Sequence, residues 1–181
     1  MRSFDTLHIA FSSLYLQYAD VLLSYGYGLG YEKEDIEDAM QDVFFNLYSK
    51  NPSLGGISNI KFYLFYGLKN RLLNSARNKR VGKIVDIEEV DFVTEVSISD
   101  EMIADEESRA IKERVEKGLA QLTNRQREAI YLRYINELEY DDIARLLNMT
   151  KPSVRNLVFR ALKEMRENMP DVPLFSLILM I

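Results

Sequence analysis

The sequence lacks cysteine altogether and contains a single histidine in 181 residues. Without thiols the chain can form neither disulfides nor thiolate metal sites, which suits a reducing cytosol. His8 precedes the first helical pattern, and we expect it to be structural or simply exposed. A phosphate-binding glycine loop, a Ser–His–Asp set and a metal-binding motif are missing as well. The sequence therefore predicts a protein that is not an enzyme and that needs neither a metal nor another cofactor.

Strand patterns and long apolar runs are also scarce. Apolar residues recur at intervals of three and four without sustained alternation, which predicts an all-α fold. Residues 1–5 are not a basic region followed by a long apolar run, so we expect no signal peptide. The apolar stretch within 170–181 is far shorter than the ~20 residues that span a bilayer. We expect a cytoplasmic protein without an integral membrane segment, whose tail packs against the protein or, alternatively, binds a regulatory partner.

Positive charge is scarce overall but concentrated in two places. The net charge is −5, yet residues 60–83 contain seven Lys or Arg and no acid. Residues 86–108 contain ten acids and no base, and residues 151–166 contain five bases against one acid. A duplex responds to the local patch within roughly 10 Å, the Debye length, more than to the sum. Either basic run alone is typical of a solvated helix face, but two of them around an acidic linker favour a nucleic-acid partner.

Three helices are predicted in residues 1–82, which we interpret as the first domain. The first follows the apolar pattern of residues 11–23 and is expected to stop at Gly26, Gly28 and Gly30. The second has a single apolar stripe, and the third covers about residues 58–80. Residues 83–107 are interpreted as an acidic linker that provides solubility and spacing. The residues expected to face inward are Ile36, Ala39, Met40, Val43, Phe44 and Leu47 in the second helix and Ile60, Leu64, Leu68 and Leu72 in the third.

Residues 108–169 are interpreted as a second domain that contains a helix-turn-helix at about 139–160. Thr123 and Gln126 have the spacing of a capping box, which starts a helix expected to end at Asn136. Asn148 can adopt the left-handed conformation that ends a helix, and Thr150 can cap the next one. The alternative is a helical hairpin that binds no DNA. Side chains suited to phosphates or base edges occupy the outer face of the last helix: Lys151, Ser153, Arg155, Asn156 and Arg160.

The second domain closely resembles region 4 of bacterial RNA polymerase sigma factors. The similarity lies in residues 122–134 (LTNRQREAIYLRY), 138–147 (LEYDDIARLL) and 154–163 (VRNLVFRALK). Residues 35–48 (DIEDAMQDVFFNLY) resemble region 2.2, and residues 60–80 resemble regions 2.3 and 2.4. The absence of regions 1 and 3 is typical of the small extracytoplasmic-function (ECF) group of the sigma-70 family. The expected architecture is a region 2 helical bundle joined by the acidic linker to the region 4 helix-turn-helix.

This resemblance implies a promoter-recognition subunit that binds core RNA polymerase and directs promoter-specific transcription initiation. Its expected partners are the β′ coiled coil and β flap of the polymerase, the −35 and −10 elements of promoter DNA, and an anti-sigma factor. It is also expected to assist melting of the −10 element. The alternative is a helix-turn-helix regulator whose N-terminal domain dimerises or senses a ligand, but such a regulator needs no acidic helix followed by a basic, aromatic one.

The resemblance also assigns residues to the first domain's contacts. A solvated face is the alternative for the acidic helix, while a carboxylate metal cluster is disfavoured because no histidine accompanies it. Phe62, Tyr63, Phe65 and Tyr66 could stack on unpaired bases at roughly 1–3 kcal/mol each, although core packing is favoured for each one. In the family, loop 51–59 forms a pocket for a flipped base. The expected polymerase contacts are Asp35, Glu37, Asp38, Gln41, Asp42 and Phe45, and the expected −10 contacts are Lys61, Asn70, Arg71, Asn74, Arg77, Lys79 and Arg80.

Four positions depart from the pattern of many relatives. Glu139 stands where relatives often have a capping Ser, and Glu is a poorer cap. Glu137 and Asn148 stand where many have Gly. Leu157 replaces an Arg, which removes one expected DNA contact. These departures leave the fold intact and make the −35 preference the property that is hardest to predict.

Overall fold

The computed structural model describes residues 2–50, 56–79, 92 and 106–168. All regular structure in these ranges is helical, and the chain divides into two compact units, Met1–Glu89 and Val90–Ile181. The predicted all-α, two-domain architecture is therefore confirmed. The predicted linker, except for Phe92 and the first residues of a helix, and the predicted tail lie outside the described residues. Within the described residues, no helix is both long and apolar enough to cross a membrane.

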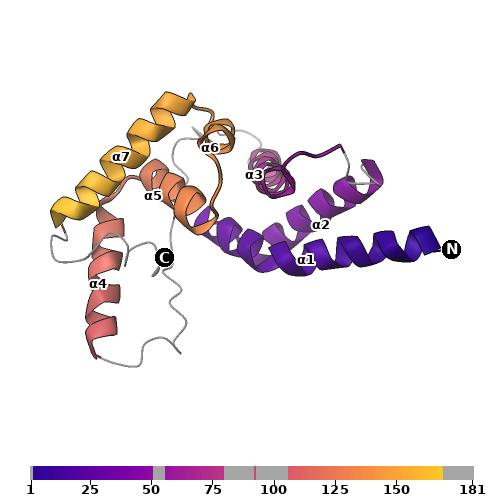
Figure 1. The fold of residues 1–181 in the computed structure, drawn as a ribbon, viewed down its shortest axis with the longest axis horizontal. Coiled ribbons are helices and arrows are strands. Elements are labelled where there is room, and N and C mark those ends of the chain that lie inside the picture. Colours follow the sequence, from indigo (N-terminus) through magenta and orange to yellow (C-terminus); the bar gives the residue numbers. More distant parts are fainter. Residues whose placement is uncertain (1, 51–55, 80–91, 93–105, 169–181) are drawn as a thin grey trace. The chain divides into compact units, whose positions relative to one another are not determined.

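The first unit is a bundle of three mutually packed helices, α1 (Arg2–Gly28), α2 (Lys33–Lys50) and α3 (Ile60–Lys79) (Figure 1). The predicted stripe of α2 is buried except for Phe44, which is half-buried with its ring 5.1 Å from that of Tyr15. The rings of Tyr25 and Phe65 lie 4.9 Å apart in the core. Helix α3 contributes Phe62, Leu64, Phe65, Leu68 and Leu72 to this core, while Ile60 is half-buried.

Helix α1 ends at Gly28, within the glycine cluster that is predicted to stop it. Gly26 has a further role in packing, because a Cβ there would lie only 2.6 to 2.8 Å from side-chain carbons of Ile36. The two helices therefore approach each other closely at this point. The residue that reverses the backbone is Gly30, whose φ of 75° lies in the left-handed region.

The second unit packs the long helix α7 (Lys151–Asn168) against α4 (Glu106–Gln121), α5 (Asn124–Ile130) and α6 (Tyr140–Leu146). The predicted capping box is confirmed: the Thr123 N–H donates to Gln126 Oε1 at 2.8 Å, and the Gln126 N–H donates to Thr123 Oγ1 at 3.3 Å. The core is formed by Val115, Leu119, Leu122, Ile130, Leu132, Ile143, Val154, Val158 and Ala161.

The helix that begins at this capping box widens before it ends. After α5 the backbone forms a π-helical turn, η3 (Tyr131–Ile135), and the Asn136 N–H donates to the Tyr131 carbonyl at 3.1 Å. The sequence predicts the end at Asn136 correctly but not the wider turn. Burial raises the pKa of the Tyr131 hydroxyl, and a hydrogen bond with Asn136 opposes this in smaller measure.

Candidate polymerase and promoter interfaces

Helices α6 and α7 form the predicted helix-turn-helix. Ala144 is buried at the crossing, and its carbonyl accepts from the Met149 N–H at 2.8 Å. Asn148 has a φ of 53°, so it provides the left-handed turn that the sequence predicts. The Ser153 N–H then donates to Thr150 Oγ1 at 3.3 Å, which caps α7. The turn is therefore fixed by local hydrogen bonds at both helix ends.

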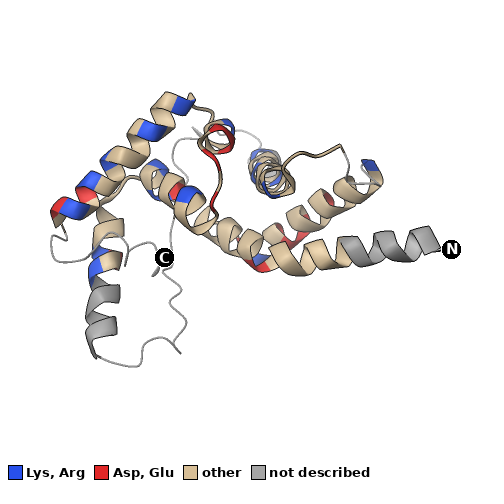
Figure 2. Ribbon diagram, viewed as in Figure 1, with Lys and Arg blue, Asp and Glu red and all other residues tan. Residues whose placement is uncertain are grey.

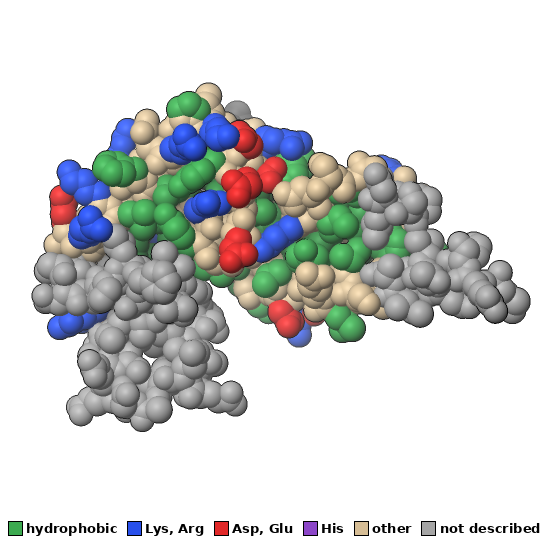
Figure 3. Space-filling model, viewed as in Figure 1, with side chains coloured by type: hydrophobic (Ala, Val, Ile, Leu, Met, Phe, Trp, Pro, Cys, Tyr) green, Lys and Arg blue, Asp and Glu red, His purple; other side chains and the backbone are tan. Residues whose placement is uncertain are grey.

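The outer face of α7 carries all five residues predicted to contact the −35 element. Lys151, Ser153, Arg155, Asn156 and Arg160 are exposed, whereas the buried residues of α7 lie at Val154, Val158, Ala161 and Met165. Figure 2 shows basic residues along the whole length of α7. In the space-filling view, Lys and Arg side chains alternate with apolar ones on this face of the second unit (Figure 3). The face thus combines positive charge, which can contact phosphates, with apolar surface, which can contact thymine methyl groups.

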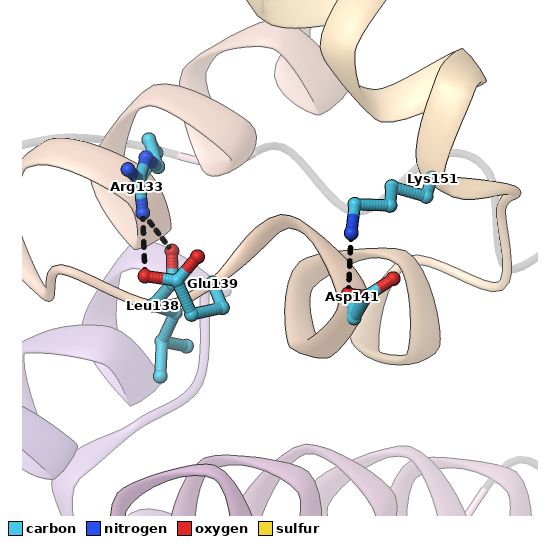
Figure 4. A network of polar contacts seen from close by, with 5 residues as sticks. All are labelled: Arg133, Leu138, Glu139, Asp141 and Lys151. Atoms are coloured by element: carbon cyan, nitrogen blue, oxygen red, sulfur yellow. Dashed lines mark hydrogen bonds and ion pairs between the residues drawn. The ribbon is translucent and has the colours of Figure 1, made fainter.

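The residues before α7 hold two of these side chains in place. Lys151 Nζ lies 2.6 Å from Asp141 Oδ2 (Figure 4). The guanidinium carbon of Arg155 lies 5.4 Å from the centre of the Tyr140 ring, and that of Arg133 lies 4.8 Å from the same centre. Tyr140 is therefore in cation–π contact with two arginines. The same network includes Arg133 Nη1, which donates to the Leu138 carbonyl at 2.8 Å.

One residue on this face is absent from the sequence prediction. Phe159 is 68% exposed and follows Arg155 by four residues, so it lies one turn further along the same side of α7. The sequence could have indicated its exposure, because Phe159 lies outside the apolar stripe that forms the buried side of α7. Leu157, which replaces an arginine of many relatives, is half-buried. Phe159 therefore extends the surface formed by Arg155 and Asn156.

The other departures have visible structural consequences. Glu139 is the N-cap of α6 but makes no side-chain capping bond, and its carboxylate lies 3.5 Å from Arg133 Nη1 instead. Glu137 and Asn148, where many relatives have Gly, are the described non-glycine residues with positive φ, at 52° and 53°. A side chain at such a φ is strained, more for Glu than for Asn. The turns therefore keep a glycine-type backbone without glycine.

The predicted polymerase-contacting residues lie on the side of α2 away from its buried stripe. Glu37, Asp38, Gln41, Asp42 and Phe45 are exposed, and Asp35 is half-buried. Phe45 is 68% exposed, an unusual position for a phenylalanine. Acids at Glu34 and Asp35 in the first turn also favour the helix dipole. We call the set Glu37, Asp38, Gln41, Asp42 and Phe45 the α2 face.

Helix α3 brings together only part of its predicted −10 set. Asn70, Asn74 and Arg77 follow one another at intervals of four and three, and Tyr63 and Tyr66 continue this row toward the N-terminus. Phe62 and Phe65 are buried, as the preference for core packing predicts, whereas Tyr66 is 43% exposed. Lys61 is half-buried and precedes the buried Leu64 by three residues, so it lies on a different side of α3 from this row. The Lys79 side chain and Arg80 lie outside the described part of the chain.

Arg71 connects the two predicted sets. Its Nη1 lies 3.0 Å from Asp42 Oδ2, so an expected DNA contact is paired with an expected polymerase contact. Both side chains remain about half exposed, at 46% and 59%. Solvent therefore screens this pair, which we expect to contribute no more than about 0.5 kcal/mol to folding.

Comparisons with known proteins agree with this geometry. Residues 112–165 match the family described as sigma-70, region 4. The chain is 26% identical over 157 residues to RNA polymerase sigma factor YlaC of Bacillus subtilis (strain 168), covering 86% of this chain and 90% of that one. It is 24% identical over 162 residues to ECF RNA polymerase sigma factor SigM of the same strain, covering 84% and 91%.

A solved structure shares the fold. The sigma factor RpoE of Bartonella quintana, crystallised with the anti-sigma factor NepR, matches with a TM-score of 0.57 and 21% identity, covering 91% of this chain and 99% of that one. Residues 112–165 thus match sigma-70 region 4, and the chain is similar over most of its length to RNA polymerase sigma factors. One of these relatives is an ECF sigma factor, and the two-unit helical fold is that of a solved sigma factor.

Proposed function

We propose that the protein performs the two tasks of an ECF sigma factor with separate faces: the α2 face binds core RNA polymerase, while α3 and α7 recognise the −10 and −35 elements. One observation supports this assignment most strongly. A single chain exposes an acidic face with a neighbouring phenylalanine on α2 and a basic face that includes a phenylalanine on α7. Acidic and basic faces of this kind suit a protein partner and DNA, respectively.

The α2 face has the composition of a protein-binding surface. Phe45 is an exposed aromatic side chain that a partner could bury; Gln41 and Asp42 lie one turn before it on α2, and Asp38 lies two turns before it. Aromatic anchors ringed by polar residues account for most of the binding energy in typical interfaces. The partner proposed here is the coiled coil of the β′ subunit, with a further contact between the second unit and the β flap.

Recognition of the −35 element is proposed to divide among the residues of α7. Arg155 and Asn156 can donate and accept at base edges in the major groove, where Arg favours guanine and Asn favours adenine. Phe159 can contact a thymine methyl group. Lys151 and Arg160 are suited to phosphates, which contribute affinity without sequence information. All five side chains named in this paragraph are exposed, so each can reach DNA, which supports the proposal.

Recognition and melting of the −10 element are proposed for the row on α3, in which Tyr66, Asn74 and Arg77 are exposed and Tyr63 and Asn70 are half-buried. Tyr63 and Tyr66 can stack on unpaired bases, and Asn70, Asn74 and Arg77 can bind the adjoining bases and phosphates. Stacking on an aromatic side chain contributes roughly 1–3 kcal/mol per base, enough to favour the open strand locally. Of loop 51–59, only residues 56–59 are described.

We further infer that the protein is not an enzyme, that it acts in the cytoplasm and that an anti-sigma factor controls it. The crystallised relative from Bartonella quintana is bound to an anti-sigma factor, which supports the last inference. The helix-turn-helix regulator is the less favoured alternative, because it leaves the α2 face and the aromatic row of α3 without a task.

The decisive experiment is reconstitution with core RNA polymerase. The purified protein should co-elute with the core enzyme and direct run-off transcription from a promoter selected out of a randomised duplex library. A variant with Asp38→Lys and Phe45→Ala should lose co-elution, whereas Arg155→Ala should keep it and change the promoters selected. DNA binding by the free chain without any interaction with core polymerase would instead support the regulator.

A further inference from the structure

Phe92 lies 13 residues after the end of α3 in the sequence, and it is part of the core of the second unit. Its side chain is 1% exposed, and its ring centre lies 5.4 Å from that of Tyr131, with the planes at 58°. Its backbone carbonyl accepts a hydrogen bond from Arg127 Nε at 2.7 Å. Both the side chain and the backbone of this residue are therefore held by the second unit.

Arg127 makes this attachment part of a helix junction. Its Nη1 donates to the carbonyls of Leu119 at 3.2 Å and Leu122 at 2.6 Å, at the end of α4. Its Nη2 donates to Asn124 Oδ1, at the start of α5. One guanidinium thus holds the α4–α5 junction and the Phe92 carbonyl together, and hydrogen bonds from a charged donor are stronger than neutral ones.

Phe92 differs from all its neighbours in the sequence in being aromatic. Residues 84–105 contain no other aromatic residue, and acids are distributed on both sides of Phe92. Acidic side chains do not enter an apolar core without partners. Phe92 is consequently the one residue in this stretch that offers a large aromatic surface for burial.

We propose that Phe92 is an internal anchor that ties the acidic segment between the two units to the second unit. Twelve residues, 80–91, then join Lys79 of α3 to the anchor, whereas 26 residues, 80–105, would join α3 to α4 without it. At full extension these stretches span roughly 45 Å and 95 Å. The anchor halves the greatest possible separation of the two DNA-binding units, and a shorter connection raises their effective concentration for one another.

The anchor can be tested by lengthening the chain on either side of Phe92 and measuring the distance between the two units. The chain has no cysteine, so Ser24→Cys on α1 and Ala120→Cys on α4, both exposed, can carry spin labels for distance measurements by electron paramagnetic resonance. About ten Gly and Ser residues inserted after Ile84 should broaden the inter-label distance distribution and shift it outward by several ångström. The same insertion after Ser99, beyond the anchor, should leave the distribution unchanged.

Substitution of the anchor gives the matched control. Phe92→Ala should broaden the distribution of the uninserted chain and make the insertion after Ser99 as effective as the one after Ile84. Phe92→Leu, which keeps apolar bulk, should restore most of the original distribution. Phe159→Ala, the same truncation at an exposed position of the second unit, should have no effect. Equal broadening by the two insertions in the unsubstituted chain, or broadening by neither, would overturn the proposal.

Discussion

Helices α2 and α7 follow one design and differ in charge. Each has 18 residues, one buried stripe and an exposed phenylalanine, Phe45 or Phe159, that is 68% accessible. Asp38 and Asp42 precede Phe45, whereas Arg155 and Arg160 flank Phe159. An exposed phenylalanine is therefore common to both faces, and the sign of the neighbouring charge is what we expect to favour a protein partner on α2 and a nucleic acid on α7. This comparison yields experiments in which each helix serves as the control for the other.

The largest effect is expected on the α2 face. Combining Asp38→Lys with Phe45→Ala should weaken binding to core polymerase at least 100-fold, about 2.7 kcal/mol, because the charge and the aromatic anchor are both lost. Both positions are exposed, so the free energy of unfolding should change by less than about 0.5 kcal/mol. Fluorescence titration against core polymerase measures the first quantity and urea denaturation the second. The Phe159→Ala variant should bind core polymerase normally, and an equal loss there would refute the division of tasks.

On α7, base contacts should be separable from phosphate contacts. Arg155→Ala should reduce discrimination among −35 variants by about 1–3 kcal/mol at the position that Arg155 contacts. Arg160→Ala should weaken all sequences alike and lower the salt-dependence slope by about one. Binding of the reconstituted holoenzyme to −35 variants at several salt concentrations measures both. If Arg160→Ala changed sequence preference while Arg155→Ala lowered affinity uniformly, the orientation of α7 in the groove would be wrong.

A smaller effect is expected at the start of α6, which lacks the cap that α7 has. Glu139→Ser should stabilise the second unit by about 1 kcal/mol, because a serine hydroxyl can accept from a free backbone N–H at the helix start. The loss of the exposed contact with Arg133 should offset little of this gain. Thermal unfolding measures the change. Thr150→Ala, which removes the existing cap of α7, should shift the melting temperature the opposite way.

The smallest effects concern the ion pairs next to the two faces. Asp42→Asn and Asp141→Asn remove the partners of Arg71 and Lys151, and each should lower the free energy of unfolding by no more than about 0.5 kcal/mol. The two substitutions should differ in binding. Asp141→Asn should strengthen DNA binding slightly by freeing Lys151, whereas Asp42→Asn should weaken core polymerase binding. A stability loss well above 1 kcal/mol in either variant would show that the pair is structural.

Features encoded by neighbouring residues could be predicted from the sequence. The stripe of α2, the Thr123 capping box and the left-handed Asn148 each depend on residues within one or two turns. The π turn after Ile130 could not be predicted, because the apolar spacing there also fits an α-helix. The packing role of Gly26 could not be predicted either, because it depends on Ile36, on another helix.

The candidate sites were predictable to a similar extent. Exposure of the α2 face and of the five residues on α7 follows from their position opposite the buried stripes. The Asp42–Arg71 pair joins residues 29 positions apart, and Phe92 meets Arg127 across 35. Periodicity carries no information about such contacts, since they arise from how the helices and Phe92 pack.

The four hydrogen bonds of Arg127 also restrict how this position can evolve. Three of its nitrogen atoms serve four acceptors on separate stretches of chain. A lysine has a single nitrogen without the planar fork of a guanidinium, so it cannot reproduce this arrangement. A substitution at Arg127 would remove the bonds at the α4–α5 junction together with the one to the Phe92 carbonyl, leaving Phe92 held by the packing of its ring. We therefore expect a single change at this position to affect both the stability of the second unit and the attachment of the segment that contains Phe92.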